Sequence, residues 1–386
     1  MNFIFMSPHF PPNYYRFCVS LNEIGVKVLG LADLPYDSLR PELHSALTEY
    51  YRVEDMHDYD ELVRALGYFT HRYGKIDRID SQNEYWLETE AALRTDFNVF
   101  GINTAQIGRI KRKSLMKQSF IDAGIPAARG KIVNNIREAR DFIEECGYPV
   151  VSKPDIGVGA AKTFKISNDS ELKAFFQEKP PVDYIMEEFI KGKISSFDGM
   201  TDHNGKAVFY TSHQFSEGIM DTVNEDLNLY YYSLRELPED LEEYGLKTVE
   251  AFDVRERFFH FEFFRTDEGK LVACEVNMRP PGGLTTDMFN YANDIDVYRE
   301  WANVVVNNNF AADYSRKYHC CYVGRKMNRN YAHSHLDILN SFSEKIIHHE
   351  QICGVFSSAL GDYGYLIRSP QMDEVQEIVD YIHKQV

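Results

Sequence analysis

Two strand-like segments joined by a short polar turn restrict the fold of this chain more than any other feature. Residues 258–264 alternate between phenylalanines on one side and His260 and Glu262 on the other, which is the period of a β-strand with one buried face. Residues 271–278 alternate in the same way, and with 267–270 as a four-residue turn the two segments form an antiparallel hairpin. We expect the buried side of the second strand to consist of Val272, Cys274, Val276 and Met278.

This register places Glu262 directly opposite Glu275. Opposed side chains have Cβ atoms about 4.5–5.5 Å apart, and like charges there are destabilising, so we expect a cation between the two carboxylates. Glu262, Glu275 and Asn277 offer the oxygen ligands that Mg²⁺ prefers, and one or two ions there would bridge nucleotide phosphates, with Mn²⁺ as an alternative. Arg279 follows on the same face and is a candidate for neutralising a transferring phosphoryl group. The competing interpretation is a solvated outer face of an ordinary hairpin.

The length of 386 residues allows two or three domains. Residues 1–105 alternate short apolar and helical segments, which predicts a Rossmann-like parallel sheet with strands at 2–6, 26–31, 50–53, 76–79 and 99–102. The second predicted domain, 106–310, contains the hairpin and a small lid subdomain at about 126–190. Residues 311–386 are predicted to form a small C-terminal α/β subdomain, so the expected class is α/β, with α+β in the middle part.

Composition excludes several classes of partner. The formal charge of −17, from 59 acidic against 42 basic residues, argues against binding to nucleic acid, because a polyanion requires a cationic face. No stretch approaches the roughly 20 apolar residues that span a bilayer, so we expect no membrane association. The six cysteines are scattered without a paired motif, which indicates reduced thiols in a cytoplasmic protein.

A glycine-containing loop follows the strand that ends near Lys153. Gly157 and Gly159 precede Lys162, but a Walker loop needs glycine where Ala161 stands, and a dinucleotide fingerprint needs a third glycine at position 162. What remains is a loop whose backbone N–H groups can lie over phosphates, with an ordinary turn as the alternative.

Residues 184–190 form a strand that runs into a turn. The free end of such a strand can offer backbone groups to the edge of an adenine ring, while a carboxylate accepts a hydrogen bond from the adenine amino group. The alternative is a plain edge strand with acidic side chains on the surface.

Taken in order, these segments resemble the ATP-grasp superfamily, and in particular its carboxylate–amine ligases. The resemblance covers roughly residues 110–300 and implies a two-subdomain ATP-grasp fold after the N-terminal domain. It implies ATP-binding roles for Lys113 and Lys153 at the phosphates, for Gly157, Gly159 and Lys162 in the covering loop, and for Glu187, Glu188 and Ile190 at the adenine. By the same resemblance Glu262, Glu275 and Asn277 bind Mg²⁺, and Arg279 is catalytic.

Two departures from the family pattern concern the nucleotide. Many members carry a glutamate for the ribose two residues after the hinge glycine, where this chain has Ile194. We expect either that Asp198 substitutes for it or that the ribose is held differently. Asp155 stands in the glycine loop where relatives often have glycine or a neutral residue.

The resemblance implies an ATP-dependent, ADP-forming ligase that activates a small carboxylic acid or amino acid as an acyl phosphate for attack by an amine. The alternatives are a biotin-carboxylase-like subunit that uses bicarbonate and a non-catalytic nucleotide-binding regulatory protein. Predicted walls of the substrate pocket are residues 211–235, including His213, and the segment after Gly283, although each of these residues has a packing role as its alternative. The expected partners are small-molecule substrates, and the expected assembly is a homodimer.

Overall fold

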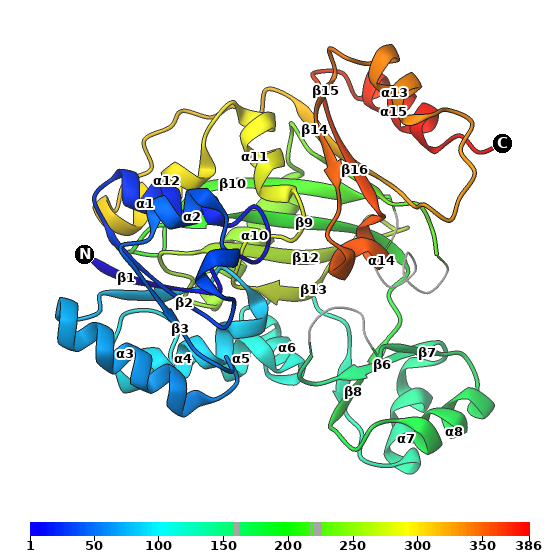
Figure 1. The fold of residues 1–386 in the computed structure, drawn as a ribbon. Coiled ribbons are helices and arrows are strands. Elements are labelled where there is room, and N and C mark those ends of the chain that lie inside the picture. The colour runs from blue at the N-terminus through cyan, green and yellow to red at the C-terminus, as the bar shows by residue number, and fades with distance from the viewer. Residues whose placement is uncertain (158–161, 217, 219–225) are drawn as a thin grey trace.

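The computed structural model describes residues 1–157, 162–216, 218 and 226–386. The strands in this part of the chain form three sheets: a parallel N-terminal sheet, a large central antiparallel sheet and a small sheet that projects from it (Figure 1). The predicted α/β class, with a parallel N-terminal sheet and antiparallel structure in the middle, is confirmed. No helix in the described ranges is long and apolar enough to cross a membrane.

The N-terminal sheet has the strand order β3-β2-β1-β4, and its neighbouring strands are parallel. Its two inner strands, β1 and β2, are apolar runs that are buried along nearly their whole length, as expected for strands covered by helices on both faces, whereas the edge strand β3 is only partly buried. Its elements are β1 (Asn2–Met6), α1 (Tyr15–Glu23), β2 (Lys27–Ala32), α2 (Pro41–Ala46), β3 (Glu49–Arg52), α3 (Tyr59–Tyr73), β4 (Arg78–Asp80) and α4 (Leu87–Asp96).

The predicted strand at 99–102 is wrong. The segment is irregular, because Gly101 adopts a φ of 127° and lies so close to Arg94 that a Cβ would meet the guanidinium at 2.9 Å. The carbonyl of Ile102 accepts a hydrogen bond from Arg94 instead of pairing with a strand. The segment therefore wraps around a buried arginine.

The central sheet has eight strands in the order β13-β12-β9-β10-β11-β14-β16-β15. Its first five strands in chain order are β9 (Gly192–Thr201), β10 (Ala207–Phe215), β11 (Tyr230–Ser233), β12 (Phe258–Thr266) and β13 (Leu271–Asn277). The C-terminal strands β14 (His319–Arg325), β15 (Ile346–Gln351) and β16 (Tyr363–Ser369) extend the same sheet. Helices α10 (Glu239–Ala251), α11 (Thr285–Asn293), α12 (Val297–Asn307), α13 (His335–Ser341), α14 (Ser357–Leu360) and α15 (Met372–His383) surround it (Figure 1).

The two faces of the central sheet have different partners. Phe197, Phe259 and Phe261 pack with α10 and with the helix α6 (Lys113–Asp122), which follows α5 (Gly108–Lys111). On the opposite face Met200 and Phe258 join the core of the N-terminal unit. The domain boundaries near residues 105 and 310 stay predictions.

The hairpin β12–β13 has the predicted pair, Glu262 opposite Glu275, but a bulge lies beside it. Nearer the turn the register shifts by one residue, so that Phe263 faces Ala273. The buried side of β13 is consequently formed by Leu271, Ala273, Val276 and Met278. The prediction that Val272 and Cys274 belong to this side is wrong, because an extra residue in one strand moves the side chains that follow it to the other face.

The small sheet has the order β5-β8-β6-β7 and carries its own core with helices α7 and α8. It projects from the main body beside the end of the hairpin (Figure 1). Its elements are β5 (Gly130–Ile132), α7 (Ile136–Cys146), β6 (Val150–Pro154), β7 (Phe164–Ile166), α8 (Asp169–Glu178) and β8 (Tyr184–Glu188).

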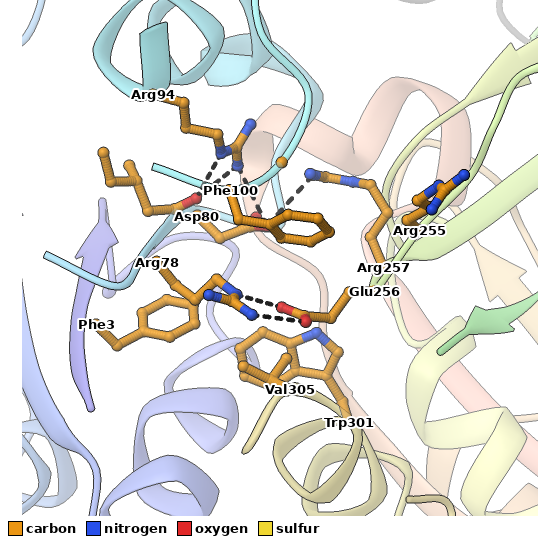
Figure 2. A pocket seen from close by; sticks show the side chains of 12 residues that line it. Phe3, Arg78, Asp80, Arg94, Phe100, Arg255, Glu256, Arg257, Trp301 and Val305 are labelled. Atoms are coloured by element: carbon orange, nitrogen blue, oxygen red, sulfur yellow. Dashed lines mark hydrogen bonds and ion pairs between the residues drawn. The ribbon is translucent and has the colours of Figure 1, made fainter. Parts of the chain in front are cut away.

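Buried ion pairs join the N-terminal sheet to the hairpin (Figure 2). Arg257, just before β12, donates from Nε to the carbonyl of Met278 at 2.9 Å, and its Nη2 lies 3.4 Å from Asp80 at the end of β4. Arg94 lies 2.8 Å from Glu90 and also contacts Asp80. Burial and the neighbouring Asp80 raise the pKa of Glu90, so this carboxylate depends on Arg94 and Arg257 for its charge.

Replacing Arg94 with methionine should lower the free energy of unfolding by about 3–5 kcal/mol at pH 7.5, because Glu90 would lose its nearest cation inside the protein. The loss should be smaller at pH 5. A carboxyl whose folded pKa is raised costs stability as the pH rises, and removal of Arg94 raises the pKa of Glu90 further. Urea unfolding of both proteins at the two pH values measures this difference.

The matched control is Arg255→Met. Arg94 and Arg255 both line the pocket shown in Figure 2, but the ion pair of Arg255 with Asp253 is exposed, so its loss should cost no more than about 1 kcal/mol. An Arg94→Met loss of that same size, or one independent of pH, would contradict the role given to the buried pairs.

Candidate active site

The site lies on the face of the central sheet that also carries His260 and Glu262. The strand register aligns two rows of side chains across β13, β12, β9 and β10. One row contains Asn277, His260 and Asp198, and the next contains Glu275, Glu262, Ser196 and His213. Alternation along each strand sends these side chains to one face, while the phenylalanines between them enter the core.

Glu262 and Glu275 face each other across the hairpin, as predicted. Burial raises the pKa of Glu275, and although Lys113 lowers it, the charge of Glu262 raises it again. The Nζ of Lys113, at the start of α6, lies 3.6 Å from Glu275 and donates to the carbonyl of Gly157 at 3.3 Å. Two of the predicted phosphate and metal residues, Lys113 and Glu275, are thus in direct contact.

Glu187 on β8 holds two lysines. Its carboxylate oxygens lie 2.6 Å from the Nζ of Lys153 and 2.7 Å from that of Lys117. Burial alone would raise the pKa of Glu187, but the two ammonium groups hold it at about 2. The same pairing outweighs burial at Lys153 and raises its pKa. Lys153 therefore remains charged, and the predicted contact of Glu187 with adenine stays a prediction.

The other residues predicted to bind adenine or to cover the phosphates lie at the end of β8 and in the glycine-containing loop. The carboxylate of Glu188 forms an ion pair with Arg129, whose Nη2 lies 2.7 Å away. The predicted contribution of Glu188 to adenine binding is therefore that of its backbone. Ile190 is half-buried and lies two residues after the end of β8. Lys162 is exposed with a φ of 60°, and Gly159 lies outside the described residues.

Asp155 acts as a helix cap for α6, which explains its presence beside the glycine loop. Its Oδ1 accepts from the backbone N of Ser114 at 2.8 Å, and its carbonyl accepts from the backbone N of Lys113. An aspartate there satisfies free N–H groups of the first turn. This contact attaches the end of β6 to the helix that presents Lys113.

Arg279 forms an ion pair with a residue of the N-terminal unit. Its Nη2 lies 2.7 Å from Glu84, in the 3₁₀ turn after β4, and the other oxygen of Glu84 lies 3.3 Å from Lys111. Burial lowers the pKa of Arg279 but Glu84 outweighs this, and the net pKa is raised. The Nη2 of Arg279 also lies 3.5 Å from the Oδ1 of Asn277, so the two residues predicted to bind metal and phosphoryl group are adjacent.

Asp198 does not lie where a ribose can contact it, and that expectation is corrected. Its side chain is 0% exposed, and its oxygens accept from His260 at 2.5 Å and from His213 at 2.7 Å. His213, predicted as a wall of the substrate pocket, is instead buried beneath the site. The other ring nitrogen of His260 lies 3.2 Å from Glu262. Burial lowers the pKa of His260, but Asp198 and Glu262 raise it to about 9.

Cys274 reaches the site because of the bulge in β13. Burial raises the pKa of its thiol to about 12; Lys153 lowers it, while Glu262 and Glu275 raise it. The thiol is therefore close enough to the lysine and to the facing carboxylates for their charges to affect its pKa. Sequence alternation alone assigns it to the core.

The oxygen donors present fit a hard divalent cation. Glu262 and Glu275 oppose each other and repel, as the raised pKa of Glu275 shows, and Asn277 adds an amide oxygen at the end of the same strand. Within the described ranges no group of three or more His, Cys, Asp or Glu side chains is arranged to hold a metal ion.

Several residues of the site were missed by reasoning from the sequence. Lys117 lies one helical turn after Lys113, a spacing that places both on one face of α6 and was a usable signal. The alternation of β12 puts His260 on the side of Glu262, but nothing in that pattern predicts its partner Asp198. Glu84 and Lys111 have no local signal, because their role depends on how the N-terminal unit packs.

Comparisons with known proteins show which families this chain resembles. A family model described as the ATP-grasp domain matches residues 146–287. The chain is 23% identical to an L-arginine-specific L-amino acid ligase of Bacillus subtilis over 66% of this chain, and 29% identical to D-alanine–D-alanine ligase B of Clostridium perfringens over 46%. It spans 64% and 60% of the length of these two relatives.

The solved structure of an L-amino acid ligase from Bacillus licheniformis has the same fold. Its TM-score is 0.76 at 13% identity, and the match covers 99% of this chain and 96% of the other. At this identity the likeness concerns the fold alone.

The thiol of Cys274 should react slowly with iodoacetamide. At pH 8 a pKa of about 12 leaves about one thiol in 10⁴ ionised, so labelling should be at least about a hundredfold slower than at Cys353 in the C-terminal part. The rate should rise about tenfold for each pH unit above 8. Peptide mass spectrometry measures both sites in one sample, and urea should equalise them. Native labelling of Cys274 as fast as that of Cys353 would contradict its placement.

Proposed function

The chain belongs to the ATP-grasp superfamily, and on this premise we propose that it is an ATP-dependent ligase that joins a small carboxylic acid to an amine. The proposed reaction transfers the γ-phosphoryl group of ATP to the carboxylate, and the amine then displaces phosphate from the acyl phosphate. ADP and phosphate are the other products. The observation that carries this proposal is the convergence of Lys113, Lys153 and Arg279 on the facing pair Glu262 and Glu275.

The two lysines supply charge for the phosphates. Lys113 already contacts Glu275 and the carbonyl of Gly157, at the start of the glycine loop. Lys153 is held in its charged form by Glu187 and also lies near the charge of Glu275. Positive groups here offset the phosphate charge that would repel an incoming carboxylate.

The metal residues of the proposal are Glu262, Glu275 and Asn277. These three side chains would hold a Mg²⁺ ion, which would supply positive charge to offset that of the phosphates. The protein's own contribution is to hold the two carboxylates in one place on the rigid hairpin. Their mutual repulsion makes that place attractive to a cation.

Arg279 is the proposed catalytic residue, because it stands beside Asn277 and is fixed by Glu84. A guanidinium presents planar donors that match the oxygens of an acyl phosphate. Glu84 follows β4, so its ion pair with Arg279 brings this arginine to the carboxyl end of the N-terminal sheet. We propose that the carboxylate substrate binds between that sheet and Arg279, since ligands of open α/β sheets bind beyond the carboxyl ends of the strands.

Two of the similar proteins are named as L-amino acid ligases, which supports an amino acid as the acid, the amine or both. The adenine would lie along the strand end formed by Glu188 and Ile190, with Gly157, Gly159 and Lys162 over the phosphates. For the ribose, neither Ile194 nor the buried Asp198 supplies an exposed carboxylate.

Incubation with Mg²⁺ and ATP and with pools of carboxylic acids, amino acids and amines should yield ADP only when both an acid and an amine are present. Coupled nucleotide chromatography and mass spectrometry of products measure this requirement. AMP as the sole nucleotide product would contradict the acyl phosphate. ADP formation that needs bicarbonate alone would favour the carboxylase alternative.

The variant Glu275→Gln tests the proposed metal site, because it keeps the size of the side chain and removes one carboxylate ligand. It should fold like the wild type and lose product formation by at least about a hundredfold, since the charge compensation at the phosphates is lost. Turnover at the wild-type rate in this variant would remove Glu275 from the metal site.

A further inference from the structure

We propose that Asp198 is a positioning residue that fixes the metal ligand Glu262 through His260, with His213 as a second anchor. The inference rests on the proposed function, because it assigns a task to residues behind the proposed metal site. It replaces the expected ribose contact of Asp198 with a role beneath the sheet surface.

The contacts form one continuous chain. His260 bridges the two carboxylates: its Nδ1 is 2.5 Å from Asp198 and its Nε2 is 3.2 Å from Glu262. The second oxygen of Asp198 is 2.7 Å from the Nδ1 of His213 and accepts from Ser196 at 2.5 Å. Each link is a direct hydrogen bond, so the orientation of Glu262 depends on a ring that Asp198 holds.

The backbone makes this chain rigid. Asp198 is paired with His260 in the register of β9 and β12, and Ser196 is paired with both Glu262 and His213. The anchors therefore stand on central strands of the eight-stranded sheet, while Glu275 and Asn277 stand on its edge strand β13. The interior strands therefore fix the orientation of Glu262, the proposed metal ligand on β12.

Burial separates this role from nucleotide contact. Asp198, Ser196 and His213 are at most 1% exposed, so none of them can touch a bound nucleotide directly. Burying a carboxylate between two imidazoles costs desolvation free energy, so we expect this arrangement to serve a function. Partners of this kind orient ligating side chains in metal sites, and their loss typically lowers metal affinity by about 10–100-fold.

The experiment compares Mn²⁺ binding with nucleotide binding in the full chain. Mn²⁺ affinity at saturating ADP is measured by electron paramagnetic resonance, and ADP affinity in EDTA by calorimetry. Asp198→Asn should weaken Mn²⁺ binding by about 10–100-fold and change metal-free ADP binding by less than about twofold. Asp202→Asn is the matched control, a buried aspartate just beyond β9 whose contacts are backbone N–H groups of the turn to β10.

His260→Asn is the second variant and keeps the proposal testable if Asp198→Asn does not fold. An asparagine retains a donor near the Nδ1 position toward Asp198 but loses the bond to Glu262, so it should show the same selective loss. Wild-type Mn²⁺ affinity in these variants, or a parallel loss of metal-free ADP binding, would overturn the positioning role. A wild-type protein that binds no ADP would instead overturn the proposed function, so the two failures are distinguishable.

Discussion

The repulsion between Glu262 and Glu275 is the constraint around which the rest of the site is arranged. Two carboxylates that face each other on adjacent strands destabilise a hairpin unless positive charge lies nearby. The structure surrounds them with Lys113 at 3.6 Å from Glu275, with His260 at 3.2 Å from Glu262, and with Lys153 close enough to affect the pKa of Glu275. Each cation comes from a different element, so the site forms only when α6, β6 and β12 pack together.

Four cationic side chains of the site have an anionic partner other than Glu262 and Glu275. Glu187 holds Lys153 and Lys117, Asp198 holds His260, and Glu84 holds Arg279. Buried charges are tolerated only when they are paired and hydrogen-bonded, which explains why the charged groups alternate in sign away from the hairpin. The N-terminal unit takes part in this pattern through Glu84 and through Arg94 and Arg257 with Asp80. Its sheet is thereby part of the active-site frame.

Local patterns in the sequence predict those features that depend on one or two strands. Alternation places Glu262 opposite Glu275, and the apolar rhythm of the first hundred residues predicts the parallel sheet. The bulge in β13 is not visible in that alternation, so Cys274 was assigned to the wrong face. Local patterns do not predict the roles of Glu84 and Asp198. Their partners, Arg279 and His260, lie 195 and 62 positions away in the chain, and only the packed fold brings each pair together. Residues 158–161 of the glycine loop lie outside the described part, and their predicted place over the phosphates stays a prediction.

The most direct test of the central claim is the stability of Glu275→Gln relative to the wild type without divalent metal. The raised pKa of Glu275 means that its ionised form costs stability as the pH rises, so the variant should equal the wild type or exceed it by about 1 kcal/mol at pH 7.5 in EDTA. Addition of Mn²⁺ and ADP should then stabilise the wild type more than the variant. A variant that is less stable than the wild type by more than about 1 kcal/mol in EDTA would show that the facing carboxylates are not held together for a cation.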